Sequence, residues 1–210
     1  MADSHDHAFM RHCFDLAREA AGRKELAFGS VIARDGVVVA AQGNAVRAEQ
    51  DVTRHAEVCA IVAAQKKLGR PSLDGCTLYT NVEPCAFCSY AIRETRIARV
   101  VFALASPVMG GTSRWDVLHD TGLGDTMPEV FGPPPEIVGG FLAEEAEDLL
   151  KQAAPMTWAA TKARGLFVAE DAGRLSRAAP RPEGAVATFR AGAMEWLRRG
   201  FFDRFSRGTA

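Results

Sequence analysis

The sequence predicts an α/β fold in which a β-sheet lies between two layers of helices, a three-layer α/β/α sandwich. Expected helices and strands alternate along the chain in the order α-β-β-α-β-α-β, followed by a long loop, a strand and a helix. Strands joined through a helix are expected to pair in parallel. The chain has 210 residues, of which 48% are hydrophobic. A chain of this size and composition can bury a substantial core.

The first half of the expected domain supplies a helix, a hairpin and a second helix. In residues 7–21 the apolar side chains recur at steps of three and four, the period of an amphipathic helix. Two β-rich runs flank an Asp-Gly pair at 35–36, which predicts a tight hairpin. Residues 42–54 are polar and aperiodic, so we expect a loop there. An alanine-rich helix then begins at His55 and stops at Gly69.

The second half of the domain continues the alternation. Residues 76–82 predict a strand, residues 85–96 a helix and residues 99–105 another strand. The stretch 106–135 is rich in glycine and proline and predicts a long loop. The remaining expected elements are a short strand at 136–140 and a closing helix at 141–152.

The composition of the chain changes after residue 152. We therefore expect a domain at 1–152 and a C-terminal helical extension at 153–210, with an amphipathic basic helix at about 187–207. Residues 1–151 contain 15 Lys and Arg against 21 Asp and Glu, a balance of −6, whereas residues 152–210 contain 10 against 5, a balance of +5. This asymmetry predicts that the extension docks on the acidic domain or its dimer mate; the alternative is recruitment of RNA or another anionic partner.

Composition also excludes several classes of protein. No run of about 18 apolar residues is present, so we expect no membrane span. The first residues lack the basic-then-apolar pattern of a secretory signal. Five cysteines, an odd number, argue against a disulfide framework and for a reducing compartment, the cytoplasm. A formal net charge of −1 disfavours a protein that coats nucleic acid over its whole surface.

Two short motifs hold residues of the kinds that bind metals. A His-Ala-Glu tripeptide begins one expected helix at His55, and a Pro-Cys-Ala-Phe-Cys run with Cys85 and Cys88 begins another. One imidazole and two thiolates make three Zn²⁺ ligands, the number typical of a catalytic site whose fourth position takes water. A helix N-terminus favours thiolates, and the three-residue step puts both sulfurs on one face. The sequence therefore predicts zinc at His55, Cys85 and Cys88.

Glu57 supplies the acid–base group that such a site needs. It lies two residues beyond His55, where it can take a proton from water and deliver it to substrate. A Cys-x-x-Cys pair alone also fits a redox pair or half of a structural zinc site, and a lone histidine is usually a surface or core residue. The segment between His55 and Cys85 has the length of one helix and one strand. This spacing brings both helix starts to one edge of the sheet and favours a catalytic site.

From about residue 5 to residue 152 the chain resembles the cytidine deaminase-like superfamily, in the branch of tRNA-specific adenosine deaminase, guanine deaminase and fungal cytosine deaminase. The matching stretches are FGSVIARDG, DVTRHAEVCAI, LYTNVEPCAFCSYAI and RVVFA. The resemblance implies a mixed five-stranded sheet and a homodimer or larger assembly. It also implies hydrolytic release of ammonia from an aminated base, by attack of zinc-bound hydroxide on the amine-bearing carbon; the motif pair H-x-E and P-C-x-x-C is the known signature of zinc nucleobase deaminases.

The resemblance further implies a substrate pocket. Asn44, in the loop ahead of His55, matches the family's asparagine that hydrogen-bonds the base; the alternative is a turn residue. Trp115 and Asp116 lie in a loop that the family returns toward the pocket. There Trp115 stacks on a base and Asp116 accepts from a ring N–H or an amino group; the alternative is that the two residues are a loop anchor and a helix cap. The other expected substrate-binding residues are Phe28, Ala56 and Glu83, with the backbone near Cys85.

Departures from the tRNA-editing members favour a smaller substrate. Phe87 and Tyr90 stand where those enzymes usually have methionine and a small residue, and the closing helix lacks their Phe-Phe and basic cluster. We therefore expect a deaminase of a small aminated nucleobase or nucleoside. The alternatives are a tRNA-specific adenosine deaminase that makes inosine and, from another class, a non-catalytic zinc-stabilised binding module. The alternative for Phe87 and Tyr90 is that both side chains only pack their helix onto the sheet.

Three arginines, Arg93, Arg96 and Arg99, form a cationic stretch beside the Cys-x-x-Cys helix. Such a run is usually a solvated face, which is the interpretation we favour. Phosphate binding is the alternative.

Overall fold

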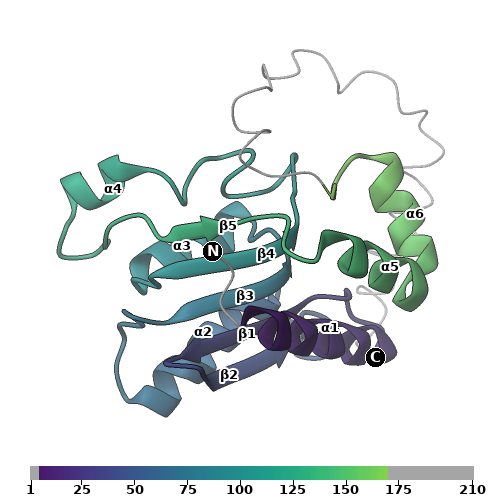
Figure 1. Ribbon diagram of the computed structural model, residues 1–210, viewed down its shortest axis with the longest axis horizontal. Helices are drawn as coiled ribbons and strands as arrows, with labels where there is room; N and C mark the ends of the chain where they lie inside the picture. The colour runs from purple at the N-terminus through teal and green to yellow at the C-terminus, as the bar shows by residue number, and fades with distance from the viewer. Residues whose placement is uncertain (1–4, 170–210) are drawn as a thin grey trace, which may run out of the picture. The chain divides into compact units, whose positions relative to one another are not determined.

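The computed structural model describes residues 5–169, in which a five-stranded sheet lies between helices (Figure 1). The fold is α/β, and the predicted three-layer sandwich is confirmed. The strands are β1 (Gly29–Arg34), β2 (Val37–Gly43), β3 (Thr77–Val82), β4 (Arg99–Leu104) and β5 (Glu136–Val138). The helices are α1 (Asp6–Gly22), α2 (Ala56–Leu68), α3 (Ala86–Glu94), α4 (Thr121–Thr126), α5 (Ala143–Ala153) and α6 (Pro155–Ala163).

The sheet is mixed, with the strand order β2-β1-β3-β4-β5. β1 pairs antiparallel with both β2 and β3, whereas the β3–β4 and β4–β5 pairs are parallel. The predicted hairpin joins β1 to β2 through Asp35 and Gly36, whose φ angles of 50° and 74° suit a tight turn between twisted strands. Because β2 and β3 are both antiparallel to β1, they run in the same direction. Their carboxyl ends therefore lie at one edge of the sheet.

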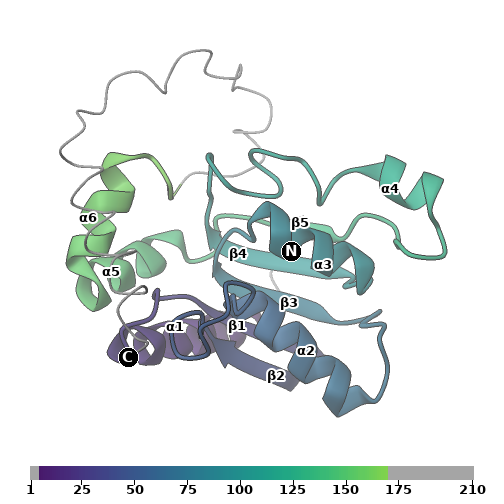
Figure 2. The same cartoon turned by 180° about the vertical axis from the view of Figure 1, so that it is seen from behind.

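Two helices cover each face of the sheet. α1 and α5 pack on one face (Figure 1), and α2 and α3 lie side by side on the other (Figure 2). Each face has its own buried apolar cluster. β1 passes so close under α1 that a Cβ at Gly29 would collide with the carbonyl oxygen of Cys13. Glycine at this position allows the close approach of strand and helix.

A buried ion pair fixes the start of α1 to the strands β3 and β4. Asp6 is fully buried and accepts two hydrogen bonds from the Arg99 guanidinium, each 2.8 Å long. The Tyr79 hydroxyl donates to the same carboxylate at 2.7 Å. A two-point Arg–carboxylate contact is among the stronger polar interactions in proteins. Arg99 is therefore part of the framework of the fold, not of a solvated face.

The chain continues to pack on the core beyond residue 152. The helix α6, at the start of the expected helical extension, follows α5, and Trp158 and Phe167 are buried in the same cluster as α1 and α5. Val168 pairs with Ala105, just past the end of β4. Residues 153–168 thus complete one face of the domain that the sequence assigns to 1–152. The expected helix at about 187–207 and its docking lie outside the described residues.

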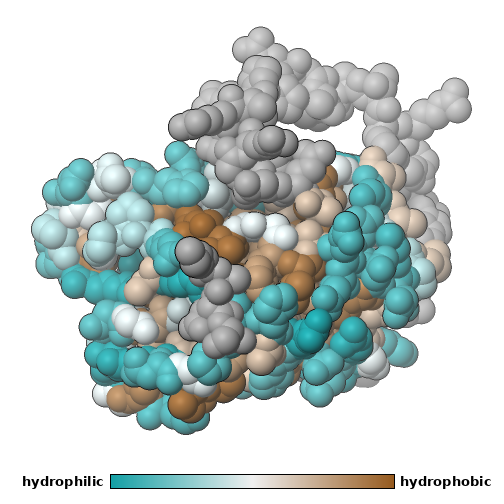
Figure 3. Space-filling view, in the orientation of Figure 1, coloured by the Kyte–Doolittle hydropathy of each residue, from teal (hydrophilic) through white to brown (hydrophobic). Residues whose placement is uncertain are grey.

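The outer face of α1 is polar. In the view of Figure 1, hydrophilic residues cover much of the described surface, and apolar residues gather near the middle of that face (Figure 3). The exposed residues of α1 include charged side chains such as Arg11, Asp15, Arg18 and Glu19. Within residues 5–169 no helix is long and apolar enough to cross a membrane.

Candidate metal centre and active site

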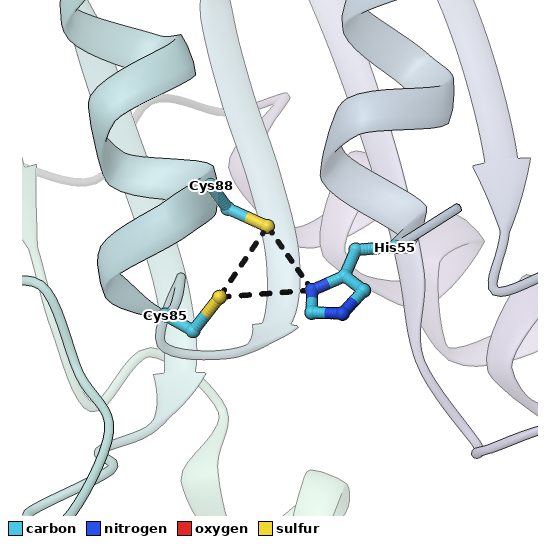
Figure 4. A group of neighbouring side chains, drawn as sticks. All are labelled: His55, Cys85 and Cys88. Atoms are coloured by element: carbon cyan, nitrogen blue, oxygen red, sulfur yellow. Dashed lines mark hydrogen bonds between the residues drawn. The ribbon is translucent and has the colours of Figure 1, made fainter. Parts of the chain in front are cut away.

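The fold brings the two predicted motifs together at one edge of the sheet. α2 follows β2 and α3 follows β3, so both helices begin where these strands end. His55 is the N-cap residue of α2, and Cys85 is the N-cap residue of α3, each with extended backbone. Cys88 lies in the first turn of α3. Side chains from two separate segments of the sequence therefore converge (Figure 4).

The three donor atoms form a triangle of the right size for zinc. The Nδ1 atom of His55 lies 3.6 Å from the sulfur of Cys85 and 3.4 Å from that of Cys88, and the two sulfurs are 3.7 Å apart. In a tetrahedral zinc site with ordinary bond lengths, two sulfurs are about 3.8 Å apart and a sulfur and a nitrogen about 3.5 Å. His55, Cys85 and Cys88 could thus hold a zinc ion without moving, as the sequence predicts.

The two thiols differ in their electrostatics. A hydrogen bond from the Cys88 thiol, supported by the His55 ring, lowers the pKa of Cys85 to about 4. The same contact with Cys85, together with burial, raises the pKa of Cys88. The hydrogen bond with Cys85 also raises the pKa of His55. Cys85 is therefore a thiolate at neutral pH, which is the form of cysteine that binds metals.

Glu57 is a buried carboxyl group in the first turn of α2. It is only 5% exposed, and it lies two residues after His55. Burial strips water from the carboxylate and raises the pKa of Glu57 to about 7. A carboxyl group of this kind takes up and releases a proton near neutral pH, as acid–base chemistry requires.

Asn44 lies on the segment that leads from β2 to His55. It is buried, and its backbone N–H donates to the carbonyl of Phe28. The next residue, Ala45, donates its N–H to the carbonyl of Arg54, directly before His55. The turn between these residues therefore brings Asn44 close to the start of α2. Phe28 lies beside Asn44 through the same backbone bond.

Glu83 holds the loop that follows β4 and that lies against Cys85. Its buried carboxylate accepts hydrogen bonds from the backbone N–H groups of Ser106, Thr112 and Ser113 and from the Ser113 hydroxyl. A Cβ at Gly110 would collide with this carboxylate, and Gly110 itself pairs with Cys85. The Glu83 side chain thus organises the loop. Only the backbone of Glu83 is left for the substrate contact expected from sequence.

Several aromatic side chains surround the start of α3. The Phe87 ring packs edge-on against His55 and is 49% exposed, and Tyr90 is 46% exposed. The Tyr90 ring packs edge-on against Phe131. Trp115 is exposed, with the Arg114 guanidinium over its ring, and its backbone N–H donates to the Gly110 carbonyl. The loop that carries Trp115 is thereby tied to the Cys85 region.

Asp116 makes a contact that the sequence did not suggest. Its φ angle is 55°, and its carboxylate lies 2.8 Å from Nδ1 of the exposed His119. Asp116 therefore caps none of the described helices; the helix α4 is capped instead by Asp120.

Sequence reasoning also missed Glu25, whose carboxylate accepts from the Asn44 side chain at 3.0 Å. Glu25 and Asn44 are well separated in the sequence, and they meet because β1 and β2 form a hairpin between them. No local motif marks such a pair in a single sequence. The contact becomes visible only in the folded chain.

Comparisons with known proteins agree with this site. Residues 3–104 match the family model for the cytidine and deoxycytidylate deaminase zinc-binding region. A tRNA-specific adenosine deaminase from Agrobacterium fabrum is 33% identical over 144 residues, which cover 69% of this chain and 90% of that protein. A tRNA(Ile)-lysidine synthase from Deinococcus deserti is 36% identical over 143 residues, 68% of this chain and 25% of that protein. The chain thus spans only about a quarter of the length of such relatives.

Solved structures show the same fold. A structure from work on A-to-I editing by tRNA:A34 deaminases at the wobble position superposes with a TM-score of 0.58 at 32% identity, covering 69% of this chain and 99% of that one. A guanine deaminase from Nitrosomonas europaea gives a TM-score of 0.57 at 22% identity, over 73% of this chain and 85% of that one. The second likeness concerns the fold alone. The chain belongs to the cytidine and deoxycytidylate deaminase zinc-binding family, in the branch that includes the tRNA-specific adenosine deaminases.

Proposed function

We propose that this protein is a zinc-dependent hydrolytic deaminase that converts adenosine in a tRNA to inosine. The convergence of His55, Cys85 and Cys88 beside the buried Glu57 supports the chemistry. The substrate is supported by two relatives, each 33% identical and matched along most of its length, which are named as tRNA-specific adenosine deaminases. The resemblance to the guanine deaminase from Nitrosomonas europaea is more distant in sequence, at 22% identity.

His55, Cys85 and Cys88 are the residues that would hold the zinc. A zinc ion bound by three protein ligands supplies an activated water as the nucleophile. Glu57 takes a proton from the attacking water and delivers protons to the ring nitrogen and to the leaving amine. Water adds to the amine-bearing carbon, the carbon–nitrogen bond breaks and ammonia leaves, so that a carbonyl replaces the amine.

The remaining residues bind and orient the base. Asn44 hydrogen-bonds the ring, and Trp115 offers an exposed aromatic face for stacking on a base, a contact worth about 1–3 kcal/mol. Asp116 offers a carboxylate acceptor to an amino group of the base. Phe28, Ala56 and the backbone of Glu83 complete the pocket.

A small aminated heterocycle is the second candidate substrate, and a specific observation favours it. Residues 1–151 carry a balance of −6, which repels the phosphates of RNA. Phe87 also adds aromatic surface next to His55, which suits a planar ring without a polynucleotide attached.

The two substrates are separated by one panel of assays on protein of measured zinc content. The panel contains a tRNA with adenosine at the wobble position, the same tRNA with guanosine there, free guanine, cytosine and adenine, and their nucleosides. We expect ammonia and inosine from the first tRNA only. Turnover of a free base or nucleoside without turnover of tRNA would establish the small-molecule function instead. No ammonia from any member would favour a zinc-stabilised binding module.

We also propose that the protein forms a homodimer in the cytoplasm. Tyr90, Val108 and Met109 are each 41–46% exposed on α3 and the loop after β4. Large apolar side chains gathered on a surface often mark an interface. All five cysteines are free thiols, which fits a reducing compartment. Light scattering should give twice the chain mass, and Tyr90→Glu should give the mass of one chain.

A further inference from the structure

Glu25 organises the segment that carries Asn44, although it is not one of the predicted site residues. Glu25 lies before β1 and is 8% exposed. Its Oε2 atom accepts from Nδ2 of Asn44 at 3.0 Å and from the Arg47 N–H at 3.1 Å, and its Oε1 atom accepts from the Ala48 N–H at 2.6 Å. Both oxygens are therefore engaged by residues 44–48.

The chemistry of this contact fixes the orientation of the Asn44 amide. A carboxylate can only accept hydrogen bonds, whereas the two ends of an asparagine amide differ, one being a donor and the other an acceptor. Only the NH₂ end of Asn44 can face Glu25. The carbonyl oxygen, Oδ1, must therefore face away from Glu25.

The same carboxylate is linked to the metal centre through the backbone. Arg47 and Ala48 begin the turn that returns to Arg54, and Arg54 accepts from Ala45 directly before His55. Glu25 thus holds both the side chain of Asn44 and the path of the chain toward His55.

We propose that Glu25 is a positioning residue that makes Asn44 present an acceptor, Oδ1, to the substrate. Glu25 does not touch the substrate itself; it selects rings that offer an N–H or amino group to Asn44. In adenosine the group that meets this condition is the exocyclic amine, the group that leaves, whereas a ring with only acceptors at that point leaves Oδ1 unpaired. The inference rests on the proposed function, in which Asn44 contacts the base.

Three variants test this orientation. Glu25→Gln replaces one oxygen with an NH₂ group and allows the Asn44 amide to flip, so that its oxygen and NH₂ group exchange places. Asn44→Asp sets two carboxylates against each other. The double variant E25Q/N44D restores the donor–acceptor pair between the two side chains, with Gln at 25 as the donor, so that Asp at 44 again presents an oxygen to the substrate. Only the Arg47 N–H, which shares Oε2 of Glu25 with Asn44, loses its acceptor. The double variant also keeps the total charge of the original pair.

Steady-state kinetics distinguish positioning from a purely structural role. We expect each single variant to raise KM about tenfold or more with a smaller change in kcat, because one hydrogen bond to the substrate is lost or reversed. We expect E25Q/N44D to recover KM to within about threefold. Glu19→Gln, at an exposed position on α1, is the matched control and should leave both constants unchanged.

Two results would overturn the proposal. One is unchanged KM and kcat in Glu25→Gln. The other is a double variant that stays as impaired as Glu25→Gln while all variants lose melting temperature in parallel, which would show a structural role only.

A separate measurement tests the role of Glu25 in case the proposed function is wrong. If the unmodified protein turns over no substrate, the orientation of Asn44 is decided by NMR of its side-chain amide. A proton protected from exchange in the unmodified protein and unprotected in Glu25→Gln supports positioning by Glu25. The same protection in both proteins refutes it.

Discussion

The guanidinium of Arg93 donates to the carbonyl oxygen of Asp120 across 2.6 Å, which ties α3 to the far part of the loop between β4 and β5. The same side chain donates to the carbonyls of Val117 and Gly132 and is almost completely buried. Carbonyl groups in irregular segments need partners when they are buried. A single buried cation thus satisfies three of them and holds the loop that carries Trp115.

Replacing Arg93 should destabilise the whole domain. In Arg93→Ala three carbonyls lose a charged donor, so we expect the free energy of unfolding to fall by about 3 kcal/mol. Urea denaturation measures this loss. The control is Arg18→Ala, whose ion pair with Asp15 is solvent-exposed and should contribute less than about 1 kcal/mol. Equal effects of the two substitutions would show that Arg93 lies on a solvated face after all.

The arginines show where sequence reasoning stops. Arg93 and Arg96 both hold the backbone of the loop after β4, and Arg99 pairs with the buried Asp6. The sequence favoured a solvated face for all three, because charge alone does not say which side of a helix or strand a distant loop covers. His55, Cys85 and Cys88, by contrast, could be predicted, since helix starts and spacing are local properties and the α/β order places them at one edge.

Glu83→Gln should loosen the loop at its beginning. The Glu83 carboxylate accepts from three backbone N–H groups and one hydroxyl, so an NH₂ group in its place must face at least one donor. We expect a loss of about 2 kcal/mol in the free energy of unfolding. Glu129→Gln, at an exposed site in the same loop, is the matched control. A Glu83→Gln protein as stable as this control would contradict the assigned role.

The metal centre can be tested apart from any substrate. We expect one zinc per chain by elemental analysis, and a chelator should lower the melting temperature. Free zinc at a hundred times its dissociation constant stabilises the folded state by about 2.7 kcal/mol. The chelator would remove this contribution to stability. Cys88→Ser should lose the zinc, whereas Cys59→Ser, a half-buried cysteine outside the triangle, should keep it. Zinc bound equally by both variants would exclude Cys88 as a ligand.

Glu57 should be essential for turnover but not for folding or zinc. Because an acid–base group contributes about 10²–10⁴-fold to a rate, Glu57→Gln should lower kcat by at least about 10²-fold on the substrate found in the panel. Its zinc content and melting temperature should stay near those of the unmodified protein. Glu144→Gln, on the exposed side of α5, controls for loss of a charge. Full activity in Glu57→Gln would remove this residue from the reaction.

The end of the domain provides the last test. Trp158 is 8% exposed and lies in the buried cluster that α1 and α5 share. The alanine-rich composition after residue 152 gave no sign of this, because one buried tryptophan and one phenylalanine make little periodicity. Trp158→Ala should cost about 3 kcal/mol, as expected for a large aromatic residue removed from a core.

Met156 lies on the same helix and is 73% exposed, so Met156→Ala should change the free energy of unfolding by less than about 0.5 kcal/mol. Chemical denaturation of the two variants therefore decides where the domain ends. A large loss confined to Trp158→Ala means that α6 belongs to the cooperative unit, since the helix then unfolds together with the sheet. Equal, small effects would mean that residues 1–152 fold without it, as the sequence predicts.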